Sequence, residues 1–159
     1  MKAVFLDRDG VINEDYGYVH KIEDFKFRDG VFQGCKYLQN KGYKLFIITN
    51  QSGINRGYYS INDFLKLTEW MKKEFLKEGI EIVDVEFCPH KPDEGCECRK
   101  PNIGMITNLV NKYNIDLNNS VMIGDKESDM QLADNAGILK KILIKKNDNF
   151  FDIIKQKII

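Results

Sequence analysis

Apolar residues along this chain fall into short, nearly unbroken runs separated by longer segments with helical spacing. Five runs rich in β-branched and aromatic residues predict strands at 3–6, 43–49, 83–87, 120–124 and 141–144. These runs are apolar at almost every position rather than at alternate positions, which is typical of strands covered on both faces of a parallel sheet. The pattern therefore predicts a sheet with helices on both sides.

The segments between these runs carry apolar residues three and four positions apart. The best-marked helix begins after Ser60, which forms a capping-box pattern with Asp63, and it ends at Gly79. Further helices are predicted over 31–41, from Pro101 to about Tyr113, over 127–136, and more weakly from about Phe150. Strands alternating with helices predict an α/β fold with a doubly wound, Rossmann-like, mainly parallel sheet flanked by helices.

Length and composition favour one folded domain. The chain has 159 residues, of which 43% are hydrophobic and 30% charged, so a disordered or collagen-like protein is excluded. No internal repeat, low-complexity tract or Gly/Ser linker interrupts it, and residues 1–159 are predicted to form a single domain without a large cap domain.

The charge balance argues against a polyanionic partner. Lys and Arg total 24, and so do Asp and Glu, so no overall field attracts nucleic acid or an anionic membrane. The longest apolar runs, 44–48 and 142–144, fall far short of the roughly 20 residues that span a bilayer, and the N-terminus lacks a signal-peptide pattern. We expect a cytoplasmic monomer that binds phosphate only through a local site.

Carboxylates follow two of the predicted strands. Asp7 and Asp9 come directly after the first strand, and Asp125 follows the fourth. Ligands of such sheets bind at the carboxyl ends of the strands. Carboxylates held together repel one another unless a cation lies between them or one is protonated, and an oxygen-rich set of this kind suits Mg²⁺. Taken alone, the Asp7 segment is also compatible with a surface turn.

Other polar groups are predicted at the same edge of the sheet, and they change which chemistry it is expected to support. Thr49 and Asn50 end the second strand with a hydroxyl and an amide, which suit phosphate oxygens. Arg99, Lys100 and Lys126 supply positive charge beside the acids, which a phosphate-transfer site needs and a simple metal-binding site does not. The edge therefore predicts phosphoryl chemistry.

Three of the four cysteines lie close together in the sequence. Cys88, His90, Cys96 and Cys98 fall within eleven residues, a spacing that suits tetrahedral Zn²⁺. Four protein ligands would close the coordination sphere, so this zinc-binding loop is interpreted as structural. Free thiols or a redox pair are the alternatives. Cys35 stands apart at helical spacing and is expected to be a small buried hydrophobic residue.

The ordered combination of these residues resembles a known superfamily. The set Asp7-x-Asp9, Thr49, Lys100 and Gly124-Asp125-x-x-x-Asp129, within residues 4–129, is similar to the four motifs of the haloacid dehalogenase superfamily of phosphotransferases. Within it, the chain resembles the D-glycero-D-manno-heptose 1,7-bisphosphate phosphatases through VFLDRDGVIN, DYGYVH, FIITNQSGINRGYYS, LTEWM, CPH, CECRKP and VMIGDKESDM. That family's product feeds nucleotide-activated heptose synthesis for surface lipopolysaccharide.

The resemblance implies a role for each catalytic residue. Asp7 would be the nucleophile that forms an aspartyl phosphate, and Asp9 would protonate the leaving oxygen and later activate water. Mg²⁺ would be held by Asp7, Asp125 and the backbone carbonyl of Asp9. Thr49 and Lys100 would hold the phosphoryl oxygens.

The resemblance also implies substrate contacts. The matching positions are Asp15, Tyr16, Gly17, Tyr18, Asn50, Gln51, Ser52, Arg99 and Lys126, and the partner is a small phosphorylated sugar. Asp129 is expected to orient Asp125 or Lys126 rather than to bind metal. No role follows for His20, and the sequence does not select the α or β anomer of the heptose.

Three alternatives stay open at this point. The short segment 91–95 is typical of the related histidinol-phosphate phosphatases, whereas 17–20 and 53–57 favour the heptose enzymes. A signalling receiver shares a parallel α/β sheet, but its phosphate acceptor would fall at Thr49, which cannot form an acyl phosphate. A zinc-binding interaction module would leave Asp7, Asp9 and Asp125 unexplained.

Overall fold

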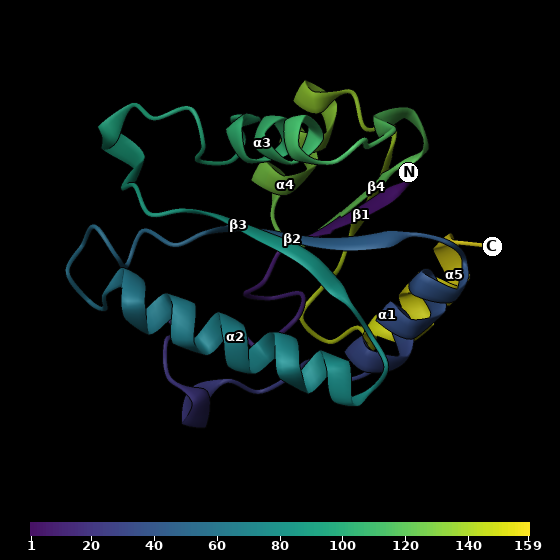
Figure 1. Ribbon diagram of the computed structural model, residues 1–159, viewed down its shortest axis with the longest axis horizontal. Coiled ribbons are helices and arrows are strands. Elements are labelled where there is room, and N and C mark those ends of the chain that lie inside the picture. Colours follow the sequence, from purple (N-terminus) through teal and green to yellow (C-terminus); the bar gives the residue numbers. More distant parts are fainter.

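Five parallel strands form the centre of the computed structural model, which describes residues 1–159 (Figure 1). In chain order the strands are β1 (Ala3–Leu6), β2 (Lys44–Asn50), β3 (Ile82–Cys88), β4 (Val121–Gly124) and β5 (Lys140–Leu143). They pair in the order β3-β2-β1-β4-β5, so the first strand lies in the middle. The predicted strands are confirmed, with ends that differ by at most one residue.

Five helices cover the two faces of this sheet. They are α1 (Val31–Asn40), α2 (Ile61–Lys77), α3 (Gly104–Lys112), α4 (Glu127–Ala136) and α5 (Phe150–Lys157), with short 3₁₀ turns at Ile22–Asp24, Pro92–Glu94 and Leu117–Asn119. Figure 1 shows α3 and α4 on one side of the sheet and α1, α2 and α5 on the other. This arrangement confirms the doubly wound α/β prediction. No helix is long and apolar enough to cross a membrane.

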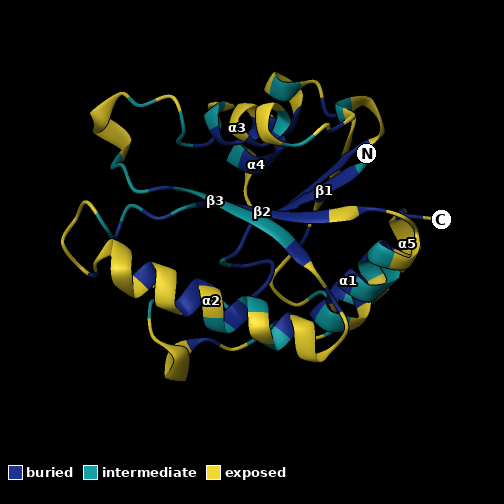
Figure 2. Cartoon of the chain, in the orientation of Figure 1, coloured by how far each residue is buried: buried dark blue, intermediate teal, exposed yellow.

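Alternate residues of the central strands feed two separate cores, because successive side chains of a strand point to opposite faces. Phe5 packs with the α3 and α4 side, and its neighbour Leu6 packs with the α1, α2 and α5 side. Both residues are fully buried, and burying a side chain of this size contributes about 1.5–3 kcal/mol. Figure 2 shows the central strands as a buried band between half-exposed helices. Cys35 lies in the first core, as expected.

Helix α2 begins where the sequence predicts it. The Ser60 hydroxyl accepts a hydrogen bond from the Asp63 amide at 3.0 Å, and the Asp63 carboxylate accepts one from the Ser60 amide at 3.0 Å. The chain leaves the helix through Gly79, which has a positive φ of 73°. Because α2 starts just beyond the carboxyl end of β2, its first turn lies close to the edge where the candidate residues gather.

The prediction that Pro101 opens a helix is wrong. Helix α3 begins three residues later, at Gly104. The Asn102 amide donates to the Arg99 carbonyl at 2.8 Å, and the Gly104 amide donates to the Glu97 carbonyl at 3.0 Å. These bonds tie the segment back to the cysteine loop, so the turn they form overrides the preference of proline for a first helical turn.

Candidate active site

A cavity of about 370 Å³ lies at the carboxyl ends of the central strands. Most of the predicted catalytic and substrate-contacting residues line it. The lining residues are Asp7, Asp9, Asp15, Gly17, Tyr18, Asn50, Gln51, Ser52, Arg56, Tyr59, Arg99, Lys100, Lys126, Ser128 and Asp129. The parallel topology therefore brings together residues that lie as far apart in the sequence as Asp7 and Asp129.

A buried lysine organises the floor of this cavity. Lys100 Nζ lies 2.9 Å from Asp7 Oδ1 and 2.8 Å from Asp129 Oδ1, and it also donates to the Ile48 carbonyl at 3.2 Å. Burial disfavours the charged form of Lys100, but the two carboxylates outweigh it and raise its pKa. Two carboxylates share one lysine, so Lys100 keeps Asp129 as a partner when Asp7 is neutral.

Asp7 and Asp125 offer the chemistry of a divalent-cation site. Carboxylate oxygens of Asp7, Asp125 and Asp129 lie within 4.8 Å of one another. Burial raises the pKa of Asp7, against the effect of Lys100, and burial also raises the pKa of Asp125. Asp125 Oδ1 is buried without a hydrogen-bond partner. A cation at this point would satisfy that oxygen and relieve the repulsion between the carboxylates.

Asp129 is already committed to other partners. Its Oδ1 accepts from Lys100 Nζ, and its Oδ2 accepts from the amides of Asp125 and Lys126, each at 3.2 Å. These bonds fix the start of helix α4 and the turn that carries Asp125. The geometry agrees with a role for Asp129 in orienting its neighbours.

A glycine permits the close approach of the two aspartate-bearing turns. Gly10 has a φ of +89°, and a Cβ atom there would lie 2.1 Å from Asp125 Oδ2. Both the backbone conformation and the space exclude a larger side chain. Gly10 therefore belongs to the site although it carries no reactive group.

Asp9 is held by Arg8 and Asn13, which sequence reasoning missed, and by the predicted residue Gln51. Its Oδ1 accepts from Arg8 Nη2 at 2.9 Å and from Asn13 Nδ2 at 3.0 Å. Its Oδ2 accepts from Gln51 Nε2 at 3.1 Å. Arg8 is fully buried and also donates to the Val19 carbonyl at 2.7 Å. No local pattern distinguishes Arg8 or Asn13, because their partners are fixed by the turn after β1.

Two of the predicted catalytic and substrate-contacting residues do not line the main cavity. Thr49 is buried, and its hydroxyl accepts from Gln51 Nε2 at 2.9 Å. Tyr16 is 64% exposed and lines a neighbouring cavity of about 410 Å³ together with Asp125. Tyr16 thus lines the neighbouring cavity, which Asp15 also lines, and the Thr49 hydroxyl is already bonded to the amide of Gln51.

The rim of the main cavity carries cations without carboxylate partners. Arg56, Arg99 and Lys126 all line the cavity, and none of them forms an ion pair. Arg99 Nη1 donates to the His90 carbonyl at 3.3 Å, and Arg56 Nε donates to Ser52 Oγ at 3.1 Å. Arg56 was not predicted, although it lies four residues after Ser52 in a segment that carries the family resemblance.

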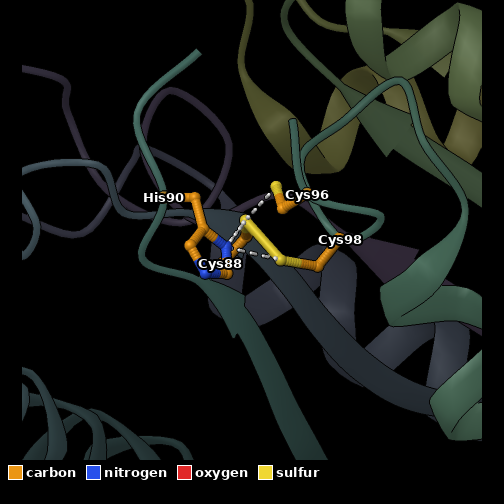
Figure 3. Close-up of side chains that lie close together, drawn as sticks. All are labelled: Cys88, His90, Cys96 and Cys98. Carbon is orange, nitrogen blue, oxygen red and sulfur yellow. Dashed lines mark hydrogen bonds between the residues drawn. A yellow bond between two sulfur atoms is a disulfide. The ribbon is translucent and has the colours of Figure 1, made fainter. Parts of the chain in front are cut away.

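The cysteine loop brings its four predicted ligands together (Figure 3). His90 Nδ1 lies 3.4 Å from Cys88 Sγ and 3.2 Å from Cys98 Sγ, and Cys88 Sγ lies 3.6 Å from Cys96 Sγ. The Cys88 and Cys98 sulfur atoms are joined as a disulfide at 2.50 Å. That bond uses two of the four groups, whereas a tetrahedral metal would use all four, and the two states exclude each other.

Comparison with known proteins identifies the family. Residues 4–153 match the family described as polynucleotide kinase 3 phosphatase. The chain is 54% identical over 153 residues to D-glycero-alpha-D-manno-heptose-1,7-bisphosphate 7-phosphatase of Campylobacter jejuni, covering 94% of this chain and 88% of that protein. It is 50% identical to D-glycero-beta-D-manno-heptose-1,7-bisphosphate 7-phosphatase of Helicobacter pylori strain J99, covering 92% of this chain and 84% of that protein. The chain belongs to the heptose-1,7-bisphosphate 7-phosphatase family.

A solved member of this family has the same fold. The crystal structure of D,D-heptose 1,7-bisphosphate phosphatase from B. bronchiseptica, complexed with magnesium and phosphate, superposes with a TM-score of 0.85 at 31% identity. The match covers 98% of this chain and 87% of that one. The family resemblance stated from the sequence is confirmed, and the haloacid dehalogenase-type sheet is shared along nearly the whole chain.

Proposed function

We propose that this protein is a phosphatase that removes the 7-phosphate of D-glycero-D-manno-heptose 1,7-bisphosphate and releases heptose 1-phosphate. The observation that carries the proposal is the buried Lys100, in contact with Asp7 and Asp129 on the floor of a cavity whose rim carries unpaired cations. The names of the Campylobacter and Helicobacter relatives support this substrate over histidinol phosphate.

The reaction proceeds in two steps on the first-strand aspartates. A carboxylate oxygen of Asp7 attacks phosphorus, the bond between phosphorus and the sugar oxygen breaks, and the protonated Asp9 gives its proton to that oxygen. Asp9, now a carboxylate, takes a proton from a water molecule that attacks the phosphoryl group on Asp7. Inorganic phosphate leaves, and both aspartates return to their starting states.

Magnesium fits the same edge. Asp7, Asp125 and the backbone carbonyl of Asp9 would hold the ion, because Asp125 Oδ1 has no hydrogen-bond partner and carboxylate oxygens of Asp125 and Asp7 lie within 4.8 Å of each other. When bound, Mg²⁺ reduces the repulsion between the anionic nucleophile and the anionic phosphate. The magnesium and phosphate in the B. bronchiseptica relative support this assignment.

The remaining residues bind the substrate. Lys100 and Thr49 are assigned to the transferring phosphoryl oxygens. The sugar and its second phosphate are assigned to the rim, which consists of Asp15, Tyr16, Gly17, Tyr18, Asn50, Gln51, Ser52, Arg99 and Lys126. A bisphosphate needs positive charge at two places, and the unpaired rim cations supply the second.

The cysteine loop is proposed to hold a structural Zn²⁺ ion through Cys88, His90, Cys96 and Cys98. The loop leads directly into Arg99 and Lys100, so the metal would fix the backbone that carries both cations. The protein is further proposed to act as a cytoplasmic monomer, with a product that enters nucleotide-heptose synthesis for lipopolysaccharide.

Phosphate release from matched concentrations of the two heptose 1,7-bisphosphate anomers and of histidinol phosphate tests the function. We expect a kcat/KM at least roughly tenfold higher for the better heptose anomer than for histidinol phosphate, a difference of about 1.4 kcal/mol in transition-state binding. The sugar hydroxyls would meet polar rim groups that histidinol leaves unpaired. Equal or reversed values would assign the protein to histidine biosynthesis instead.

A further inference from the structure

The side chain of Gln51 connects three groups at the edge of the cavity. It is 2% exposed, and its two ends have different partners. Gln51 Nε2 donates to Asp9 Oδ2 at 3.1 Å and to Thr49 Oγ1 at 2.9 Å, while Gln51 Oε1 accepts from the Tyr59 hydroxyl. A residue expected to contact substrate therefore uses its polar atoms within the protein.

The chemistry of the partners fixes the direction of this amide. Once Asp9 has given up its proton, its carboxylate can only accept hydrogen bonds, so in that state the nitrogen of Gln51 must face Asp9 and its oxygen must face Tyr59. The phenol must then donate. Burial raises the pKa of Tyr59 to about 12, so this proton is retained across the neutral range. If the amide were reversed, two acceptors would face each other at Asp9.

The Tyr59 ring is itself held in place by the surrounding chain. A Cβ atom at Gly53 would lie 2.2 Å from the Tyr59 ring, so only glycine permits this packing. The His20 ring stacks on Tyr59 with centroids 4.8 Å apart and an interplanar angle of 9°. His20 Nδ1 in turn lies 2.8 Å from the Tyr18 carbonyl, so the histidine ring is held by the loop that contains both residues.

The two oxygens of Asp9 are not equivalent in this network. Oδ1 accepts from Arg8 and from Asn13, whereas Oδ2 accepts only from Gln51. A carboxyl oxygen with a single donor keeps a lone pair for a proton. The side chain of Asp9 is 20% exposed, so that oxygen can meet a ligand in the cavity.

We infer that Tyr59 and Gln51 are positioning residues that act through Asp9, with Tyr59 setting the amide of Gln51 and that amide aiming Asp9 Oδ2 at the leaving oxygen. The inference rests on the proposed function, since it needs Asp9 to transfer the proton. As the bond from phosphorus to the sugar oxygen breaks, its electron pair goes to that oxygen, and the proton on Oδ2 joins it. A misplaced donor would slow this transfer, because small errors in position are costly in rate.

A comparison of two leaving groups tests the inference without relying on total activity. An alkoxide leaving group, as in heptose 1,7-bisphosphate, needs the proton from Asp9, whereas the p-nitrophenolate from p-nitrophenyl phosphate departs without it. Because kcat/KM reports only the steps up to phosphoryl transfer, the later hydrolysis of the phosphoenzyme does not enter. Tyr59→Phe removes the hydroxyl and keeps the ring.

We expect Tyr59→Phe to lower kcat/KM for the sugar substrate about tenfold and for p-nitrophenyl phosphate less than about twofold. Gln51→Met, which keeps the length but removes both polar atoms, should produce the same selective loss, and the loss should lie in kcat rather than in KM, which separates it from the loss of a sugar contact. In the Gln51→Met background, Tyr59→Phe should add nothing, because the bond it removes no longer exists. Tyr58→Phe is the matched control, since the neighbouring exposed hydroxyl makes no hydrogen bond, and it should change neither substrate.

Equal losses on both substrates, or additive effects of the two variants, would show that Tyr59 and Gln51 only maintain structure and would overturn the inference. Failure of the wild type to hydrolyse heptose 1,7-bisphosphate would instead overturn the proposed function. The same comparison then uses the alkyl phosphate that the wild type cleaves fastest. If it cleaves p-nitrophenyl phosphate but no alkyl phosphate, Asp9 transfers no proton to a leaving group and the inference fails as well.

Discussion

The two sides of the cavity are ordered in different ways. On one side, Asp7, Asp9 and Asp125 leave the ends of buried strands, and hydrogen bonds and ion pairs fix the side chains of Asp7 and Asp9. On the other side, the loop 89–99 has no apolar side chain larger than proline or cysteine, and residues 92–95 are exposed. The core holds the first side in place, whereas the second depends on the Cys and His cluster. Arg99 and Lys100 lie where the two meet.

On the strand-end side, a single substitution should abolish catalysis without lowering the stability of the fold. Asp7→Asn removes the nucleophile, and we expect kcat to fall by about 10⁴-fold or more with no phosphoenzyme formed. Burial and the neighbouring carboxylates disfavour the charged form of Asp7, so a neutral amide of the same shape relieves repulsion. The Tm of the metal-free variant should therefore equal or exceed that of the wild type.

Rapid-quench trapping of labelled phosphoenzyme and calorimetry of the same samples measure both effects. Near-normal turnover of Asp7→Asn would favour direct attack by water, and a clearly lowered Tm would mean that the carboxylate stabilises the fold.

On the cysteine side, substitution of the cluster should lower both the order of the loop and the activity. The short loop buries too little surface to hold one conformation, and zinc ligation can supply order worth roughly 10–16 kcal/mol, as in small zinc peptides. We expect about one zinc per chain. Cys96→Ser combined with Cys98→Ser should lose the zinc, lower kcat/KM up to about 100-fold through misplacement of Lys100, and open the loop to proteolysis while the sheet stays folded.

Elemental analysis, thiol counting and limited proteolysis make this measurement, with Cys35→Ala as the control that should keep its zinc. A metal-free wild type that is fully active, with two titratable thiols and a protease-resistant loop, would assign the order to the Cys88–Cys98 disulfide rather than to a metal.

Sequence reasoning succeeded where the information is local. The five strands follow from runs of apolar residues, and the start of α2 follows from Ser60 and Asp63, which are neighbours along the chain. The placement of Asp7 and Asp125 at one edge follows from topology alone, because all the strands run parallel.

It failed where loop geometry, rather than periodicity, decides which polar atoms pair. Gln51 reaches Asp9 across 42 positions, and the amide of Gly104 is drawn back to Glu97 instead of starting a helix at Pro101. Nothing in the sequence distinguishes Arg8 from a surface arginine, yet its side chain is fully buried against Asp9. Periodicity identifies which residues are buried and says nothing about which polar atoms meet.

The rim cations allow the two sides to be compared directly, because Arg56 belongs to the segment after β2 and Arg99 belongs to the cysteine loop. Neither arginine has a carboxylate partner. Replacing either one by alanine should raise the KM for the bisphosphate roughly threefold to tenfold, and it should raise the KM for heptose 7-phosphate less. In the Cys96→Ser, Cys98→Ser background, Arg56→Ala should keep its effect and Arg99→Ala should lose most of it. If both effects persist there, the loop does not need the cluster to position Arg99.

The smallest effect expected concerns a site remote from both sides. Asn149 caps helix α5 by accepting a hydrogen bond from the Asp152 amide at 3.1 Å, and Asn149→Ala should cost about 1 kcal/mol of global stability, or roughly 2–4 °C in Tm. Local opening of a loop does not require global unfolding, so this loss should leave the rate of proteolysis within 91–98 unchanged in the native protein. The kcat/KM of the folded enzyme should also stay the same.

Calorimetry and timed digestion measure the two quantities separately. Faster cleavage of the loop in Asn149→Ala would mean that it opens only when the whole sheet unfolds, and the two sides of the cavity would then share one source of order.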